Sequence, residues 1–141
     1  MLNHVKLSKL SIIQTKGGNI LHALKKSDNG FSGFGEAYFS CVEPNEIKAW
    51  KRHRTMISNI IVPTGKIKFV LFDSSNESLP SSKEVILSQD NYFRLTIPPM
   101  LWLGFQNLSK NTSMLLNISQ IEHDPDEIDR LDLHKLKYKW N

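Results

Sequence analysis

The stretch NEIKAWKRHRTMISNIIVPTG, residues 45–65, contains two short strand patterns and the turns that bound them, and it decides the fold. Ile47–His53 and Ser58–Pro63 are short runs rich in apolar and β-branched residues, which predicts β-strands. Asn45 follows a proline and tolerates a left-handed backbone, so a turn precedes the first strand. Gly65 ends the second strand where a tight hairpin requires positive φ. The stretch therefore predicts strands joined by tight turns.

The rest of the chain continues this pattern, and no window shows a sustained helical period of apolar residues. This predicts an all-β protein, a sandwich or closed barrel of the jelly-roll type. The further strands that we predict are Leu10–Gln14, Ile20–Leu24, Gly35–Val42, Ile67–Phe72, Glu84–Leu87, Tyr92–Ile97, Trp102–Asn107 and Ser113–Ile118. With 141 residues, 40% of them hydrophobic, the chain fits a single domain, residues 1–141.

Two segments lack strand patterns. Asp73–Lys83 is rich in serine and contains Pro80, which predicts an exposed, mobile loop. The acidic tail from Gln120 onward predicts a short helical turn after Pro125, or a surface extension that covers an edge of the barrel.

Composition excludes several classes of protein. No stretch approaches the roughly 20 apolar residues needed to span a bilayer, and the N-terminus lacks the apolar run of a signal peptide, so we expect a cytoplasmic protein without membrane contact. The single cysteine, Cys41, excludes an internal disulfide and is expected to pack in a strand. The net charge of +4 is modest, and the basic run KAWKRHR is short, which argues against a nucleic-acid partner.

The spacing of the opening stretch and of a second stretch, YFRLTIPPMLWLGFQN, resembles the two-part motif of the cupin barrels. The corresponding positions are Asn45, Lys51, His53, Ser58 and Gly65, then Tyr92, Pro98, Met100, Leu103 and Asn107. In cupins three histidines and one glutamate of this motif bind a metal ion, and only His53 remains here. Ammonium, hydroxyl and leucine side chains cannot replace the other ligands, so we expect no metal and no other cofactor.

Strand periodicity divides the first motif between two faces. If Lys51 and His53 point into the barrel, Ile47 and Ala49 point inward too, and Lys48, Trp50, Arg52 and Arg54 occupy the opposite face.

Several separated segments together resemble the short sugar-nucleotide cupins related to dTDP-4-dehydrorhamnose 3,5-epimerase, and one of them, GKIKFVLFD, is also similar to the dTDP-sugar 3,4-ketoisomerases. The others are FGEAYFS, EIKAWKRH, NIIVPTG, IPPMLWLGFQNLS and HDPDEIDR. The resemblance implies a cupin-type jelly-roll barrel and a homodimer. It also implies a metal-free epimerase or isomerase of a nucleotide-linked 4-keto-6-deoxy sugar in surface-polysaccharide biosynthesis.

The chain departs from these families at important positions. The 3,5-epimerases have a catalytic histidine, paired with an aspartate, where this chain has Lys51. The ketoisomerases have a His-x-His pair, of which His53 alone is present, and a lysine of the epimerase site falls near Ser58. The departures leave open an alternative function, a catalytically inactive cupin that binds a carbohydrate or a sugar nucleotide.

We predict three catalytic residues. Imidazole titrates near neutrality, so His53 is the candidate base. Lys51 would lower the pKa of His53 and stabilise an enolate oxygen, and Tyr38 could return the proton. Each of these residues could instead be an ordinary barrel residue.

We predict six substrate-binding residues. Arg54 and Lys48 could bind the diphosphate, although strand alternation places them opposite Lys51. Ser58 and Asn59 could bind sugar hydroxyls. Trp102 or Tyr92 could stack on the base of the nucleotide-sugar substrate, or could belong to the core.

Overall fold

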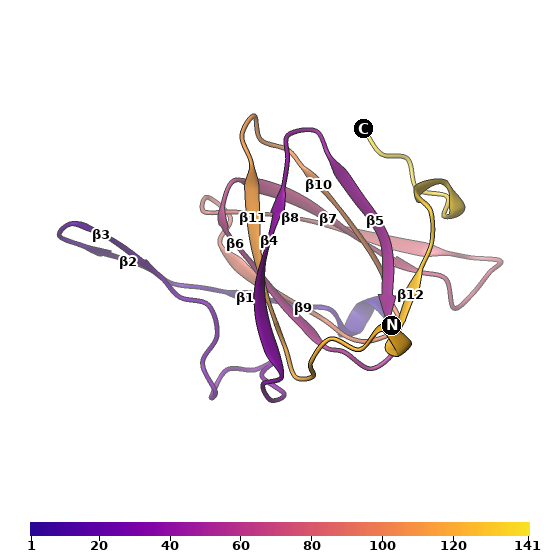
Figure 1. Ribbon diagram of the computed structural model, residues 1–141, viewed down its shortest axis with the longest axis horizontal. Helices are drawn as coiled ribbons and strands as arrows, with labels where there is room; N and C mark the ends of the chain where they lie inside the picture. Colours follow the sequence, from indigo (N-terminus) through magenta and orange to yellow (C-terminus); the bar gives the residue numbers. More distant parts are fainter.

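The computed structural model describes residues 1–141, which form two facing five-stranded antiparallel sheets (Figure 1). The first sheet has the strand order β1 (Lys6–Lys9), β9 (Phe93–Ile97), β6 (Ser58–Thr64), β11 (Ser113–Ser119) and β4 (Glu36–Val42). The second has the order β12 (Ile128–Arg130), β5 (Ile47–His53), β10 (Trp102–Asn107), β7 (Lys66–Asp73) and β8 (Ser81–Ser88). The predicted all-β class is confirmed.

A two-stranded hairpin, β2 (Ile12–Thr15) and β3 (Gly18–Leu21), projects from the side of the barrel (Figure 1). Three short 3₁₀ helices complete the chain: η1 (Leu2–His4), η2 (Pro125–Glu127) and η3 (Leu133–Lys135). No helix combines the length and apolar character that crossing a membrane would require.

The hydrophobic core lies between the sheets and is formed mainly by the inner faces of β6, β7, β8 and β9. Its fully buried members include Ile60, Val62, Phe69, Leu71 and Leu95. Burial of such side chains contributes about 1.5–3 kcal/mol each. A cavity lined by apolar and polar side chains lies beside this core, between β4, β5, β10 and β11.

Most predicted strands are observed, and β5 and β10 have the predicted bounds. The predicted loop Asp73–Lys83 is wrong at both ends, because Asp73 ends β7 and Ser81 begins β8. Cross-strand pairing with β7 extends β8 into the serine-rich segment, whose composition favoured a loop. The strands β1 and β12 are too short to give a period-2 signal.

The tail combines both predicted forms, a helical turn that begins at Pro125 and a short strand, β12, that covers the edge of β5. The expected turn conformations at Asn45 and Gly65 are also observed, with φ of 66° and 89°. A side chain at Gly65 would clash with Ser113, whose Oγ accepts the backbone N–H of Lys66 at 3.0 Å.

The predicted alternation along β5 is wrong at Lys48. In the pairing with β10, Lys51 lies opposite Leu103 and Lys48 lies opposite Phe105, so two residues of β5 lie opposite the single residue Gly104 of β10. This extra residue is a β-bulge, which shifts the side-chain alternation by one. Lys48 and Lys51 therefore lie on the same face.

Candidate functional site

A cavity of about 700 Å³ opens between β4, β5, β10 and β11. Its lining is partly apolar and partly polar, and the polar side chains come from segments that are far apart in sequence. The apolar part includes Ile60, Leu103, Phe105, Leu115 and Leu131. The polar and charged part comprises Tyr38, Ser40, Lys48, Lys51, His53, Ser58, Asn117, Arg130, Asp132 and Lys135. The cavity thus contains five of the predicted site residues, Tyr38, Lys48, Lys51, His53 and Ser58.

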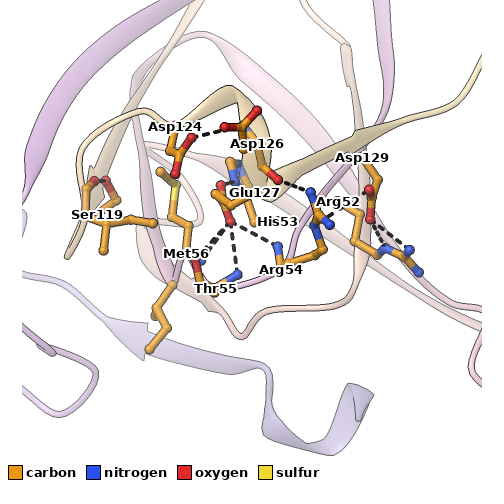
Figure 2. Close-up of polar contacts among 12 residues, drawn as sticks. Arg52, His53, Arg54, Thr55, Met56, Ser119, Asp124, Asp126, Glu127 and Asp129 are labelled. Carbon is orange, nitrogen blue, oxygen red and sulfur yellow. Dashed lines mark hydrogen bonds and ion pairs between the residues drawn. The ribbon is translucent and has the colours of Figure 1, made fainter.

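His53 stands at the end of β5 and is held by Glu127, the last residue of η2 (Figure 2). The imidazole Nδ1 makes a short hydrogen bond with Oε1 of Glu127. An ionised carboxylate can only accept, so Nδ1 carries the proton. This leaves the Nε2 lone pair of His53 for the cavity.

The other carboxylate oxygen of Glu127 is bound by the backbone that follows β5. It accepts the N–H groups of Arg54 at 3.0 Å, Thr55 at 3.0 Å and Met56 at 3.2 Å (Figure 2). Burial would raise the pKa of Glu127, but the hydrogen bonds from His53 and from the backbone of Thr55 and Met56 lower it to about 2. Glu127 is therefore a fixed anion that orients His53.

Burial lowers the pKa of His53 below its usual value. The hydrogen bond and charge of Glu127 oppose the shift, while the charges of Lys51 and Arg130 add to it. The predicted effect of Lys51 is thus present, but desolvation is larger. A neutral imidazole at neutral pH is able to accept a proton.

Sequence reasoning missed Glu127. The spacing from Asp124 to Glu127 matches a helix-capping pattern. This pattern predicts local roles for both carboxylates and gives no indication that Glu127 contacts His53. Asp124 does cap η2, because its Oδ1 accepts the N–H of Asp126 at 3.0 Å. Glu127 instead contacts β5, and no local pattern contains that information.

Lysine and arginine side chains gather along one wall of the cavity. Lys51 lies opposite Arg130 in the pairing of β5 with β12. Burial lowers the pKa of Lys51, and the charge of Arg130 lowers it further. Lys48 donates to the backbone oxygen of Cys41 at 2.9 Å. Neither lysine has an ion-pair partner, so this wall is suited to an anionic ligand.

Tyr38 and Asn117 lie on neighbouring strands, β4 and β11, at the opposite side of the cavity. The amide of Asn117 donates to the Tyr38 hydroxyl oxygen at 3.1 Å. The hydroxyl therefore keeps its own proton for donation. The amide oxygen of Asn117 is buried without a hydrogen-bond partner, and Ser58, buried at the start of β6, adds a hydroxyl.

Two predicted binding residues on the second sheet lie outside the cavity. Arg54 is ion-paired with Asp129 at 3.8 Å and donates to the backbone oxygen of Asp126 (Figure 2). Trp102 is buried, donates to Ser74 at 3.2 Å and lies beneath the guanidinium of Arg52, 4.6 Å from its ring centre. Neither residue is among those that line the cavity.

Two further predicted binding residues support the fold from the first sheet. Asn59 donates to the backbone oxygen of Gly30 at 3.1 Å and accepts from Thr96 at 2.7 Å. Tyr92 is buried and donates to the backbone oxygen of His22 at 2.7 Å. Both tie the segment after the hairpin to the barrel, away from the cavity.

The site has one histidine and no group of three or more histidine, cysteine or acidic side chains that could hold a metal ion. Its own groups supply a neutral imidazole with a fixed carboxylate, a half-buried ammonium and a phenol with a free proton. This set is able to remove a proton from carbon beside a carbonyl group, to stabilise the resulting oxyanion and to return a proton.

Known proteins share this fold and are similar in sequence over most of the chain. The family model described as "FdtA: WxcM-like, C-terminal" matches residues 3–137. The crystal structure of a dTDP sugar isomerase from Desulfovibrio desulfuricans G20 is 37% identical, with a TM-score of 0.89, over 94% of this chain and 86% of that one.

Two curated relatives are more distant. The spore coat polysaccharide biosynthesis protein SpsL of Bacillus subtilis is 24% identical over 147 residues, 100% of this chain and 97% of that protein. The probable low-salt glycan biosynthesis epimerase Agl13 of Haloferax volcanii is 25% identical over 134 residues, 89% of this chain and 85% of that protein.

Proposed function

This chain belongs to the FdtA family, WxcM-like, C-terminal, and we propose that it is a sugar-nucleotide epimerase or isomerase. Its substrate is a nucleotide-linked 4-keto-6-deoxy sugar used in polysaccharide biosynthesis. The observation that carries the proposal is the His53–Glu127 pair at the edge of a cavity of about 700 Å³. The similarity to a dTDP sugar isomerase and to a glycan biosynthesis epimerase supports the same class.

The first step uses the free nitrogen of His53. Nε2 takes a proton from the carbon beside the keto group, and the electron pair of the C–H bond forms the enolate. Glu127 stabilises the imidazolium that results, because it is an anion already bonded to Nδ1. The Lys51 ammonium stabilises the enolate oxygen.

The second step uses Tyr38. Its hydroxyl proton is delivered to the carbon from the opposite side of the cavity, which inverts the configuration. His53 and Tyr38 then regain their starting states by exchanging a proton with solvent. In the isomerase outcome the enolate oxygen takes the proton of the hydroxyl on the deprotonated carbon, and the new C–H bond forms at the former carbonyl carbon, so the keto group moves to the neighbouring carbon.

The remaining polar groups bind the substrate. Lys48 is available to a phosphate oxygen, because its neighbours include no carboxylate partner. Ser58 and the unpartnered amide oxygen of Asn117 face hydroxyl groups of the sugar. We also propose a cytoplasmic location, because a nucleotide-linked substrate would be available there.

We also propose a homodimer joined through the hairpin and β4. Ile13 and Ile20 of the hairpin are 44% and 52% exposed, and Phe39 on β4 is 62% exposed. β4 is the edge of its sheet, so its backbone groups are open to pairing. Cys41, expected to pack, is instead exposed on this edge, where a second copy would cover it.

Deuterium incorporation tests the reaction. A dTDP-4-keto-6-deoxy sugar incubated in D₂O should gain deuterium at carbon beside the keto group, and His53→Ala should abolish the gain. A catalytically inactive carbohydrate-binding cupin, which the lysine at position 51 would favour, predicts tight binding of the sugar nucleotide without any exchange.

A further inference from the structure

The C-terminal strap, residues 132–141, lies along the outer side of β5 after β12 (Figure 1). Two hydrogen bonds fix it at either end. The indole N–H of Trp50 donates to the backbone oxygen of Leu133 at 3.1 Å, and the Gln106 amide donates to that of Asn141 at 2.5 Å. The strap is therefore attached to the barrel near both of its ends.

Aromatic packing anchors the same segment. The ring of Trp140 lies 5.3 Å from that of Trp50 and 4.7 Å from that of Tyr138. The Lys68 ammonium lies 5.5 Å from the ring centres of Tyr138 and Trp140. A Cβ at Gly104 would come within 2.9 Å of Trp140. The barrel surface is shaped to accept the strap.

The lysines of the strap face two directions. Lys137 and Lys139 alternate with the half-buried Tyr138 and Trp140 and line a shallow outer groove. Lys135 lies in the 3₁₀ turn η3, where the alternation does not apply, and it lines the catalytic cavity. One lysine of three is thus directed to the site.

The charges at the cavity are unbalanced. Lys48, Lys51, Arg130 and Lys135 line it, none of them has an ion-pair partner, and the only carboxylate in the lining is that of Asp132. Lys135 is exposed and His53 is half-buried. A ligand whose anionic end remains at the mouth, with its neutral end beside His53, fits this distribution.

We propose that the C-terminal strap forms the phosphate-binding wall of the site, with Lys135, and Arg130 at the base of the strap, binding the diphosphate of the substrate. This inference rests on the proposed function, because the sugar must then reach His53. It assigns Lys135 as a specificity-determining residue that selects a nucleotide-linked sugar over the free sugar.

Calorimetric titration with thymidine diphosphate tests the wall in the full chain. Lys135→Ala should weaken binding about tenfold, and Lys135→Met, which keeps the aliphatic stem, should do the same. Lys137→Ala and Lys139→Ala remove the same charge from the same segment and should change the dissociation constant by less than about twofold. Inorganic pyrophosphate should compete with the nucleotide for the wild type and compete less well for Lys135→Ala.

Equal effects of the Lys135 and Lys137 variants would overturn the inference, as would failure of pyrophosphate to compete with the wild type. Deuterium exchange separates this failure from that of the proposed reaction. If deuterium exchange depends on His53 but replacing Lys135 leaves nucleotide binding unchanged, the proposed reaction stands and the phosphate-binding wall is rejected. If nucleotide binding depends on Lys135 but no deuterium exchange occurs, the phosphate-binding wall stands and the proposed reaction is rejected.

Discussion

His53 and Glu127, 74 residues apart in sequence, are joined by a short hydrogen bond between imidazole Nδ1 and a carboxylate oxygen. The bond joins the end of β5 to the turn η2, and it fixes which imidazole nitrogen faces the cavity. The first motif position, where related epimerases are expected to have a catalytic histidine, holds Lys51. This chain does have a histidine–carboxylate pair, but its histidine is His53, two residues after Lys51 on β5.

Glu127→Gln should slow deuterium exchange by about 100-fold. The amide removes the negative charge that stabilises the imidazolium, and its NH₂ group is able to donate to Nδ1, which favours the wrong tautomer of His53. The rate of exchange under saturating substrate measures the effect. Asp124→Asn is the matched control, because Asp124 caps η2 without contacting His53. A rate in Glu127→Gln equal to that of Asp124→Asn would remove Glu127 from the mechanism.

The free energy of unfolding should fall as pH falls below 6.5. The pKa of folded His53 is lowered from 6.5, so between the two values the unfolded chain binds more protons. The pKa of Glu127 is lowered from 4.5 to about 2. Its contribution, on the order of 3 kcal/mol, is present above pH 4.5 and is lost as pH falls toward 2.

Urea unfolding at pH 7, 5 and 3.5 checks this dependence. The Glu127→Gln variant should show less loss between pH 5 and 3.5 than the wild type, because it has no carboxylate to protonate. Parallel curves for the two proteins would contradict the assigned shift. Activity should also show an acid limb below pH 6.5, where His53 becomes protonated.

Much of the fold could be predicted because strand patterns are local. Ile47–His53 and Trp102–Asn107 were predicted with the observed bounds, since their apolar residues and flanking turns are contiguous in sequence. The face of the strand on which each side chain lies was harder to predict. The bulge opposite Gly104 depends on how β5 pairs with β10, and without it Lys48 is assigned to the wrong side.

The candidate site was predictable only in part. Motif spacing identified Lys51 and His53, but residue type alone assigned Asn59 and Tyr92 to binding, and both are buried supports of the fold. Glu127 was missed because its partner is distant in sequence. The sequence thus gives the chemical character of each side chain, but it does not give the residues that the side chain contacts in the folded protein.

Tyr92→Phe should lower stability without affecting catalysis. The change removes the hydrogen bond that the Tyr92 hydroxyl donates to the backbone oxygen of His22 at 2.7 Å, which costs about 0.5–1.5 kcal/mol. Urea unfolding measures the loss, and deuterium exchange should remain within about twofold of the wild type because the ring is outside the cavity. Tyr38→Phe is the contrasting variant, since it should strongly lower the inversion of configuration with little effect on stability. A loss of exchange in Tyr92→Phe at full stability would return Tyr92 to the site.

Replacing Ile13 and Ile20 together by glutamate should convert a dimer into a monomer. The two residues lie opposite each other across the hairpin and are exposed in the isolated chain, so charges there disturb no core of the barrel but would be buried in an interface. Light scattering should give twice the 16.2 kDa chain mass for the wild type and the single mass for the variant. Lys16→Glu, at the exposed hairpin turn, is the control and should remain dimeric. A double variant that keeps the dimeric mass would place the interface elsewhere. Two opposed carboxylates buried without partners against a second copy cost more free energy than a few apolar side chains contribute to an interface.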